Sequence, residues 1–268
     1  MKKLIKNTIY LMFATAFCSF LFLSNQSFLA KCFAKDISFT ESELKDYQEI
    51  EKGVSVDSDK FFEDYFSETD GKSATNYLIV IDAGHGGPDP GSIGYKTKVY
   101  EADLNLKISK MLKEKLEDSG ISVVMTRETE AALAEGRGKS FKKRDMELRK
   151  EIIKQHRPNM VISIHQNSYT NHKFSGAQVF YDKTSDISKN IADKIQAEFI
   201  KELEGSHKST SPGDYYMLKC TTAPSVIVEC GFLSNEKEEQ LLLKPEYQEK
   251  IVSAIYVGII SFLQTKNL

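Results

Sequence analysis

The chain has few cysteines, and this excludes one class of small extracellular protein. Only four of its 268 residues are cysteine, and two of these lie within residues 1–34. The remaining pair, Cys220 and Cys230, could form a single disulfide but not the framework that holds small secreted domains together. We expect each of them to be a separate, small apolar side chain in the core.

A basic surface is also missing. The formal net charge is −2, and it falls to −6 without residues 1–34, which hold four lysines and no acidic residue. Proteins that bind nucleic acid usually present a basic face to the phosphates. We therefore expect no nucleic-acid partner.

Several common nucleotide-binding and nucleophile motifs are absent. The stretch from Gly84 lacks the third glycine of the dinucleotide fingerprint, and Leu133 stands where a phosphate loop before Gly138 needs its first glycine. The sequence has no Gly-x-Ser-x-Gly elbow, no internal repeat and no appended binding module. Nucleotide chemistry and serine-hydrolase chemistry are thus not indicated.

The first 34 residues are predicted to be a signal peptide or an N-terminal membrane anchor. Lys2, Lys3 and Lys6 precede an uncharged, mostly apolar run over residues 7–30. This order is typical of a secretory signal, and the run is also long enough to span a bilayer. Whether it is cleaved stays open, and an uncleaved segment would contact the membrane. In both cases we expect the remaining chain to act outside the cytoplasm.

Residues 35–75 are predicted to be an acidic linker with short helices. Residues 35–74 hold twelve acidic residues against five lysines. Aromatic residues recur at helical spacing between residues 59 and 66. We interpret the segment as a tether whose helix docks on its own domain, and an aromatic face for a partner or a membrane surface is the alternative.

Residues 76–268 are predicted to form one catalytic domain of the α/β class. Strand patterns cover residues 78–83, 121–126, 160–164, 177–181 and 225–228. Helical patterns cover residues 101–119, 141–156 and 187–203, and a final pair divided by Pro245. Such alternation predicts a mostly parallel twisted sheet covered by helices on both faces. In the helix over 141–156 we expect Leu148, Ile152 and Ile153 to face the core.

Polar residues follow three of these predicted strands. His85 comes shortly after the first strand, His165 follows the strand over 160–164, and Glu229 follows the strand over 225–228. Glu101 begins a helix. Because the carboxyl ends of parallel strands share one edge of a sheet, we expect these four side chains to meet there.

Two imidazoles and a carboxylate form a suitable ligand set for catalytic zinc. Three protein ligands leave one position for water, whose pKa zinc lowers from about 15.7 to about 7. A second carboxylate must then accept a proton and deliver it to the leaving amine. The sequence thus predicts one Zn²⁺ per chain on His85, Glu101 and His165, with Glu229 as the acid/base. Taken singly, each of the four could instead be an ordinary polar or ion-paired residue. The chain's other histidines are weaker candidates for ligands: His156, His172 and His207.

The residues around these positions resemble the zinc-dependent N-acetylmuramoyl-L-alanine amidases of the amidase-3 family, over about residues 76–265. The matching motifs are Ile81-Asp82-Ala83-Gly84-His85-Gly86-Gly87, Glu101-Ala102-Asp103-Leu104-Asn105, Val124-Met125-Thr126-Arg127, Ser163-Ile164-His165-Gln166-Asn167 and Val228-Glu229-Cys230-Gly231-Phe232-Leu233-Ser234-Asn235. The resemblance implies the same zinc ligands, a catalytic Glu229, and hydrolysis of the amide that joins N-acetylmuramic acid to L-alanine in peptidoglycan.

Further stretches resemble the germination-specific members of that family in endospore formers. They are His85-Gly86-Gly87-Pro88-Asp89, residues 141–149, Ser175-Gly176-Ala177-Gln178 and residues 244–250. This resemblance implies action on spore cortex on the way to muramic-δ-lactam, in the forespore or cortex compartment. We expect modest metal retention and leave room for an accessory protein partner that tightens the site.

Two other functions stay open at this point. A zinc carboxypeptidase or related peptidase would use an arginine, such as Arg127, Arg144 or Arg149, to bind the substrate carboxylate. An inactive wall-binding protein would belong to a different class. The intact Glu229 argues against the second alternative, because a binding protein needs no acid/base.

Overall fold

The computed structural model describes residues 77–265, and the fold is built from these. The predicted signal peptide or anchor over 1–34 and the predicted linker over 35–75 lie outside the described residues. Within the described part, every helix is too short or too polar to cross a membrane.

Six strands form one mixed sheet. They are β1 (Leu78–Ala83), β2 (Ser122–Met125), β3 (Met160–Asn167), β4 (Gln178–Tyr181), β5 (Ser211–Pro212) and β6 (Ser225–Phe232), in the order β2-β1-β3-β6-β4-β5. Strands β1, β2, β3 and β6 are parallel, and β4 pairs with β6 in the antiparallel direction. The mostly parallel sheet predicted from the sequence is confirmed.

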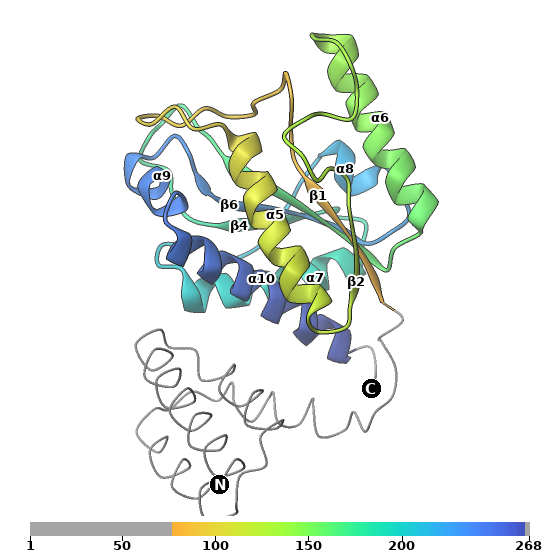
Figure 1. The fold of residues 1–268 in the computed structure, drawn as a ribbon. Coiled ribbons are helices and arrows are strands. Elements are labelled where there is room, and N and C mark those ends of the chain that lie inside the picture. Colours follow the sequence, from red (N-terminus) through yellow and green to blue (C-terminus); the bar gives the residue numbers. More distant parts are fainter. Residues whose placement is uncertain (1–76, 266–268) are drawn as a thin grey trace, which may run out of the picture. The chain divides into compact units, whose positions relative to one another are not determined.

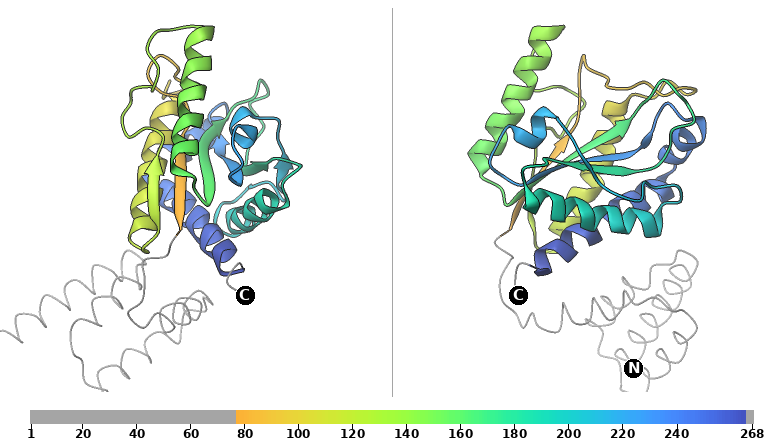
Figure 2. Two further views of the ribbon diagram at one scale, coloured as in Figure 1. Left: turned by 90° about the vertical axis from the view of Figure 1, so that its right-hand side faces the viewer. Right: turned by 180° about the vertical axis from the view of Figure 1, so that it is seen from behind.

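Helices lie on both faces of this sheet, as predicted (Figures 1 and 2). They are α5 (Glu101–Glu117), α6 (Lys139–His156), α7 (Asp186–Glu202), α8 (Tyr216–Lys219), α9 (Glu236–Leu242) and α10 (Pro245–Thr265). Helix α5 packs on β1 to β3, α7 packs on β4 and β6, and α10 contacts both helices. On the other face, α6 and α8 bury Ile153, Met217 and Leu218 in a cluster with Val80 and Ile227. The core therefore lies on both sides of the central strands.

One predicted core position in α6 is wrong. Leu148 is 42% exposed, whereas the next residue, Arg149, is 1% exposed. The helix turns Phe141, Asp145 and Arg149 toward the sheet, and the spacing of these three residues is helical. The charged Arg149 thus faces the core, where the hydropathy pattern predicts the apolar Leu148.

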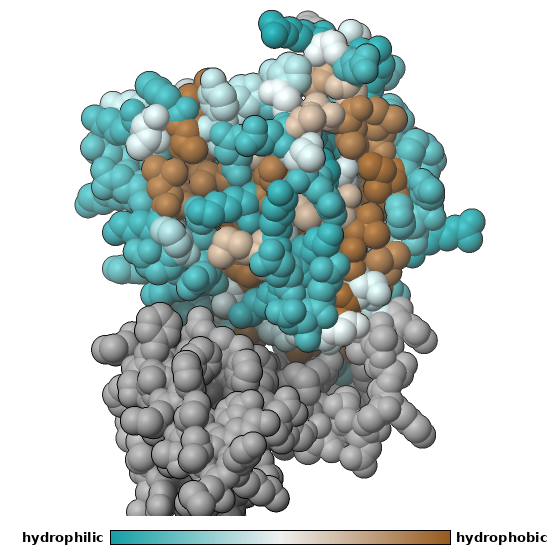
Figure 3. All heavy atoms as spheres, in the orientation of Figure 1, coloured by the Kyte–Doolittle hydropathy of each residue, from teal (hydrophilic) through white to brown (hydrophobic). Residues whose placement is uncertain are grey.

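Strand β2 forms an edge of the sheet. Its Val123 and Val124 are only partly buried. Figure 3 shows apolar residues gathered in a strip over β2 and beside α6. Helix α6 therefore leaves part of the β2 side chains accessible to solvent.

The two cysteines of the described part are separate. Cys220 is partly buried, Cys230 is buried, and neither forms a disulfide. Burial raises the pKa of the Cys220 thiol to about 11. Both behave as the small core side chains expected from the sequence.

A buried ion pair lies beneath the end of β1. Nη1 of Arg149 is 2.7 Å from Oδ1 of Asp82, and both side chains are 1% exposed. Ser163 and Thr126 donate hydroxyl hydrogen bonds of 2.6 and 2.7 Å to the same carboxylate. Burial alone would raise the pKa of Asp82, but Arg149 and these hydroxyls outweigh it and lower the pKa to about 2. The carboxylate is therefore ionised and fully partnered at neutral pH.

Two arginines hold the backbone that follows β1. Arg149 donates to the carbonyls of Ala83 and His85 at 2.8 and 2.6 Å. Arg127 donates to the carbonyls of Ala83 and Gly84 at 2.9 and 3.0 Å. Three carbonyls in a row thus accept charge-assisted hydrogen bonds, which fix the course of the chain at this point.

Replacing Arg149 should therefore lower the free energy of unfolding of the domain strongly. Arg149→Met leaves the buried Asp82 carboxylate without its charge partner, and we expect a loss of about 3–5 kcal/mol in unfolding free energy. Urea denaturation of the metal-free protein measures this loss. Arg144→Met removes an exposed arginine from the same helix and should change the value by less than about 0.5 kcal/mol. Equal losses in the two variants would contradict the structural role of the pair.

Candidate metal centre

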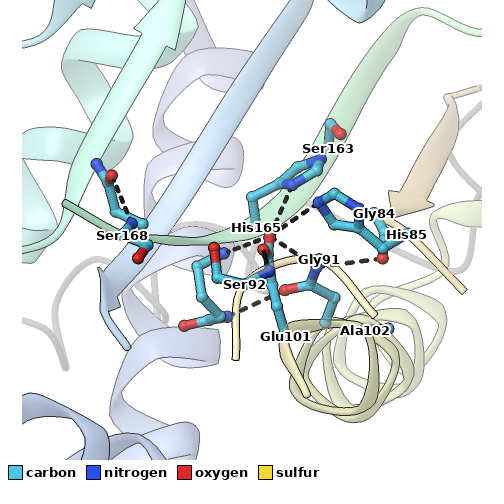
Figure 4. A network of polar contacts seen from close by, with 12 residues as sticks. Gly84, His85, Gly91, Ser92, Glu101, Ala102, Ser163, His165 and Ser168 are labelled. Atoms are coloured by element: carbon cyan, nitrogen blue, oxygen red, sulfur yellow. Dashed lines mark hydrogen bonds and ion pairs between the residues drawn. The ribbon is translucent and has the colours of Figure 1, made fainter. Parts of the chain in front are cut away.

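The structure brings the three predicted ligands together. His85 lies in the loop after β1, Glu101 is the first residue of α5, and His165 lies in β3. One nitrogen of each imidazole and one oxygen of the carboxylate all lie within 4.8 Å of one another. Figure 4 shows both rings close to Glu101, which rises from the start of the helix. The group could hold a metal ion.

The distances between these atoms suit a tetrahedral metal. Nε2 of His85 is 3.3 Å from Oε1 of Glu101, and Nδ1 of His165 is 2.9 Å from the same oxygen. Ligands about 2.1 Å from a tetrahedral zinc ion lie about 3.4 Å apart. Small shifts of the side chains would admit the ion, so the donor set fits zinc in both type and spacing.

Glu101 is held in place by several donors. Its Oε2 accepts a 2.7 Å hydrogen bond from the backbone of Ser92, and its Oε1 accepts bonds from the backbone of Gln166 and from Nδ2 of Asn105. Burial would raise the pKa of this carboxyl, but hydrogen bonds to His165 and His85 hold it well below its usual range. Glu101 is thus a fixed, ionised candidate ligand.

His85 has an unusual backbone conformation. Its φ is 63°, in the left-handed region that residues other than glycine rarely adopt. Nδ1 of the ring is 2.9 Å from Oδ2 of Asp89. Burial alone would lower the pKa of His85, but the hydrogen bonds to Asp89 and Glu101 outweigh it and raise the pKa to about 9. Without metal, the ring is therefore protonated on both nitrogens and positively charged at neutral pH.

Two glycines leave room for the ligands. A Cβ atom on Gly84 would lie 2.2 Å from the ring of His165. A Cβ atom on Gly91, whose φ is 68°, would lie 2.5 Å from Oε2 of Glu101 and 2.7 Å from the ring of His85. Glycine is needed at both positions because the side chains of the candidate ligands approach the backbone closely.

Glu229 lies in β6 at the register position opposite His165 of β3. It is buried, and its Oε2 has no hydrogen-bond partner within the described residues. Burial, with a smaller contribution from the charge of Glu101, raises its pKa to about 7 although the two histidines oppose this. A carboxyl with this pKa can hold or release a proton near neutral pH, and a nearby dication would favour the ionised form.

The positions of His165 and Glu229 differ from prediction in one respect. We expected both to follow the ends of short strands, but β3 continues to Asn167 and β6 to Phe232. Both residues therefore lie within paired strands. Their side chains are positioned by the sheet itself, which is more rigid than a loop.

The remaining candidates do not join this group. Nδ1 of His156 bonds the carbonyl of Ile152, and that of His172 donates to the carbonyl of Ser234. His207 stacks against Phe232, with ring centroids 6.4 Å apart. These contacts give each of the three histidines a structural place away from the predicted ligands.

The arginines that a carboxypeptidase would need are engaged elsewhere. Arg127 and Arg149 are 4% and 1% exposed and donate to backbone carbonyls and buried carboxylates. Arg144 is exposed on α6 and contacts the carbonyl of Glu135. Arg127 and Arg149 have no free donor face for a substrate carboxylate, which removes the main support for that alternative.

Exposed aromatic side chains lie on the loops that follow β3 and precede α5. Tyr169 and Phe174 follow β3, are 55% and 46% exposed, and form an edge-to-face pair at 4.7 Å. Tyr95 precedes α5 and lies 4.3 Å from the ring of His172. Glu239 fixes the loop of Tyr95 by accepting hydrogen bonds from the residues that follow it. Tyr169 and Phe174 thus leave part of their ring surfaces open to solvent on the loop that follows β3.

Comparisons with known proteins agree with this geometry. Residues 79–261 match the family Amidase_3, described as N-acetylmuramoyl-L-alanine amidase. A germination-specific N-acetylmuramoyl-L-alanine amidase from Bacillus subtilis (strain 168) is 36% identical over 194 residues, covering 71% of this chain and 81% of that protein. The family predicted from the motifs is confirmed.

Solved structures of amidases have the same fold. The CwlD amidase from Clostridioides difficile, in complex with the GerS lipoprotein, matches with a TM-score of 0.68 and 40% identity, over 71% of this chain and 100% of that chain. The catalytic domain of CwlV, an N-acetylmuramoyl-L-alanine amidase from Bacillus (Paenibacillus) polymyxa var. colistinus, matches with a TM-score of 0.63 and 28% identity. It covers 70% of this chain and 98% of that one.

Metal affinity should depend on pH. Imidazole must be neutral to bind a metal, and the pKa of metal-free His85 is about 9. Below that pH the metal competes with a proton, so we expect affinity to fall by about tenfold per unit as pH drops from 8 to 6. Calorimetric titration in two buffers of different ionisation enthalpy gives the affinity and the proton release together. A constant affinity over this range would be the contrary result.

Gly84→Ala should weaken metal binding. The added Cβ would overlap the ring of His165, so the ligand must move, and we expect a loss of about 10–100-fold in affinity. Gly231→Ala is the matched control, because its Cβ would meet Leu242 at an ordinary 3.4 Å. Competition with a chromophoric chelator measures both, and unchanged affinity in Gly84→Ala would refute the crowding argument.

Proposed function

The chain belongs to the N-acetylmuramoyl-L-alanine amidase family Amidase_3, and on this basis we propose that it cleaves the amide bond between N-acetylmuramic acid and L-alanine in peptidoglycan. The chain is thus an amide hydrolase by family. The observation that carries the proposal is the grouping of His85, Glu101 and His165, with the buried Glu229 opposite His165 in the sheet. Its Oε2 has no hydrogen-bond partner among the described residues.

The proposed cofactor is one Zn²⁺ ion, held by His85, Glu101 and His165. When bound, zinc polarises a carbonyl and makes water acidic near neutral pH. Glu101 supplies a negative charge, and its backbone donors keep that charge oriented. Two imidazoles and a carboxylate support zinc because this ligand set is typical of catalytic zinc sites.

Glu229 is proposed as the general acid/base. It takes a proton from the attacking water and delivers it to the nitrogen of L-alanine as the amide breaks. Its position opposite His165 and its raised pKa support this role. The exposed rings of Tyr169 and Phe174 could contact the uncharged faces of the sugars.

We further propose that the substrate is the peptidoglycan of spore cortex, on the way to muramic-δ-lactam. The germination-specific amidase of Bacillus subtilis (strain 168), at 36% identity, supports this assignment. The N-terminal segment over 1–34 would direct the chain out of the cytoplasm, residues 35–75 would link it, and residues 76–268 would form the catalytic domain.

An accessory protein partner is part of the proposal. The related CwlD amidase was solved in complex with the GerS lipoprotein, and a site with three protein ligands is expected to retain metal modestly. A partner that binds the metal-loaded form would raise the apparent metal affinity by mass action.

Glu229→Gln tests the proposed chemistry. The amide cannot accept the proton, so we expect kcat on purified spore peptidoglycan to fall by at least about 100-fold. New free amino groups of L-alanine, identified by mass spectrometry of the released peptides, measure the reaction. Metal content should remain one zinc per chain.

The outcome separates the two parts of the proposal. Zinc-loaded wild type that releases only internal peptide fragments would refute the assigned bond. A fully active Glu229→Gln variant would refute the role of Glu229 alone. Glu128→Gln, which changes an exposed glutamate on the surface, is the control and should retain wild-type activity.

A further inference from the structure

We propose that Asp89 is a positioning residue that sets which nitrogen of His85 is available to the metal. When the ring gives up one proton to bind a metal, the carboxylate holds the remaining proton on Nδ1 and thereby leaves Nε2 free to coordinate. This inference rests on the proposed metal-dependent function. It goes beyond it because it assigns the metal affinity partly to a residue outside the ligand set.

The geometry of the pair is that of a carboxylate supporting a metal-bound histidine. Oδ2 of Asp89 is 2.9 Å from Nδ1 of His85, and Nε2 on the other side of the ring lies 3.3 Å from Oε1 of Glu101. The two ring nitrogens therefore have separate partners. Nδ1 points to a carboxylate outside the candidate ligands, and Nε2 points into the group that could hold the ion.

The loop between the two residues brings Asp89 back onto the ring. The backbone N–H of Gly86 donates to the carbonyl of Asp89 at 2.9 Å, and that of Asp89 donates to the carbonyl of Gly86 at 3.1 Å. Arg149 donates to the carbonyl of His85 at 2.6 Å. The backbone at both ends of the contact is thus fixed before any metal binds.

The carboxylate of Asp89 is itself held on its other oxygen. Oδ1 lies 3.0 Å from Nζ of Lys142 on α6 and accepts a 3.3 Å bond from the backbone of Gly91. The side chain of Asp89 is 17% exposed, whereas that of Lys142 is 63% exposed. The contact with His85 is therefore partly shielded from water, and the contact with Lys142 is a surface ion pair of small energy.

His165 is held differently. Its Nδ1 faces Oε1 of Glu101, itself a candidate ligand. Within the described part of the chain, the ring of His85 contacts a carboxylate that is not itself a candidate ligand, and the ring of His165 does not. Carboxylates in this position fix the tautomer and orientation of a ligand, and their loss typically costs 10–100-fold in metal affinity.

The test compares zinc affinity and ring tautomer in variants of the full chain. After each affinity is corrected for the proton competition that its own pH dependence measures, we expect Asp89→Ala to bind zinc about 10–100-fold more weakly in competition with a chromophoric chelator. Asp89→Asn should lose less, because its amide oxygen can still accept a hydrogen bond from the N–H at Nδ1. Nitrogen-15 NMR of the zinc-loaded imidazoles should show His85 bound through Nε2 in wild type and a mixture of bound nitrogens in Asp89→Ala.

Two controls separate positioning from charge and from folding. Asp103→Asn removes one negative charge from an exposed position on the first turn of α5, and Lys142→Gln removes the surface partner of Asp89. Both should change zinc affinity by less than about threefold. The melting temperature of metal-free Asp89→Asn should stay close to that of wild type. If Asp89 only anchored the loop, its replacement would lower the melting temperature and leave the His85 tautomer unchanged.

Several results would overturn the inference. Zinc affinity of Asp89→Ala within twofold of wild type would refute it, as would an equal loss in Asp103→Asn. An unchanged His85 tautomer in both Asp89 variants would also refute it. If wild type binds zinc and cleaves peptidoglycan while Asp89→Ala matches it, only this inference fails. A wild-type chain that binds no zinc overturns both the inference and the proposed function.

Discussion

The fold of the candidate site depends on the buried pair of Asp82 and Arg149 at the end of β1. Arg149 pairs with the carboxylate and also donates to the carbonyls of Ala83 and His85. Arg127 adds donors to the neighbouring carbonyl of Gly84. These contacts compensate for the left-handed backbone of His85, which would otherwise be a local cost of order 1–3 kcal/mol. The candidate ligand His85 is thus positioned by charged groups buried in the core.

The other groups of the site are fixed by regular structure. Glu101 begins α5 and is held by backbone donors, whereas His165 and Glu229 lie side by side on β3 and β6. A site built this way would need little rearrangement to admit a metal ion, and preorganised charges are the main source of catalysis in many enzymes. Glu229 is the exception, because it is buried and its Oε2 has no partner among the residues that the structure describes. That exception is consistent with a group that must exchange a proton.

Sequence reasoning identified the parts of the site that follow from topology. Strand β1 was predicted with its bounds, and the convergence of His85, Glu101 and His165 follows from the shared edge of parallel strands. Burial of Arg149 in place of Leu148 was not predictable from hydropathy, because it depends on the distant Asp82. The short α8 and β5 carry too few residues for a periodic pattern. Asp89 belongs to a recognised motif, but the sequence does not predict its hydrogen bond to His85, because that contact depends on the conformation of the loop between them.

The central claim is that His85, Glu101 and His165 form a zinc site in an amidase domain. X-ray absorption at the zinc edge on the purified, zinc-loaded chain tests it most directly. The account predicts two imidazole nitrogens and carboxylate oxygen at about 2.0–2.2 Å, and the loss of one imidazole in His165→Ala. Sulfur at about 2.3 Å, or a spectrum without imidazole scattering, would contradict the account.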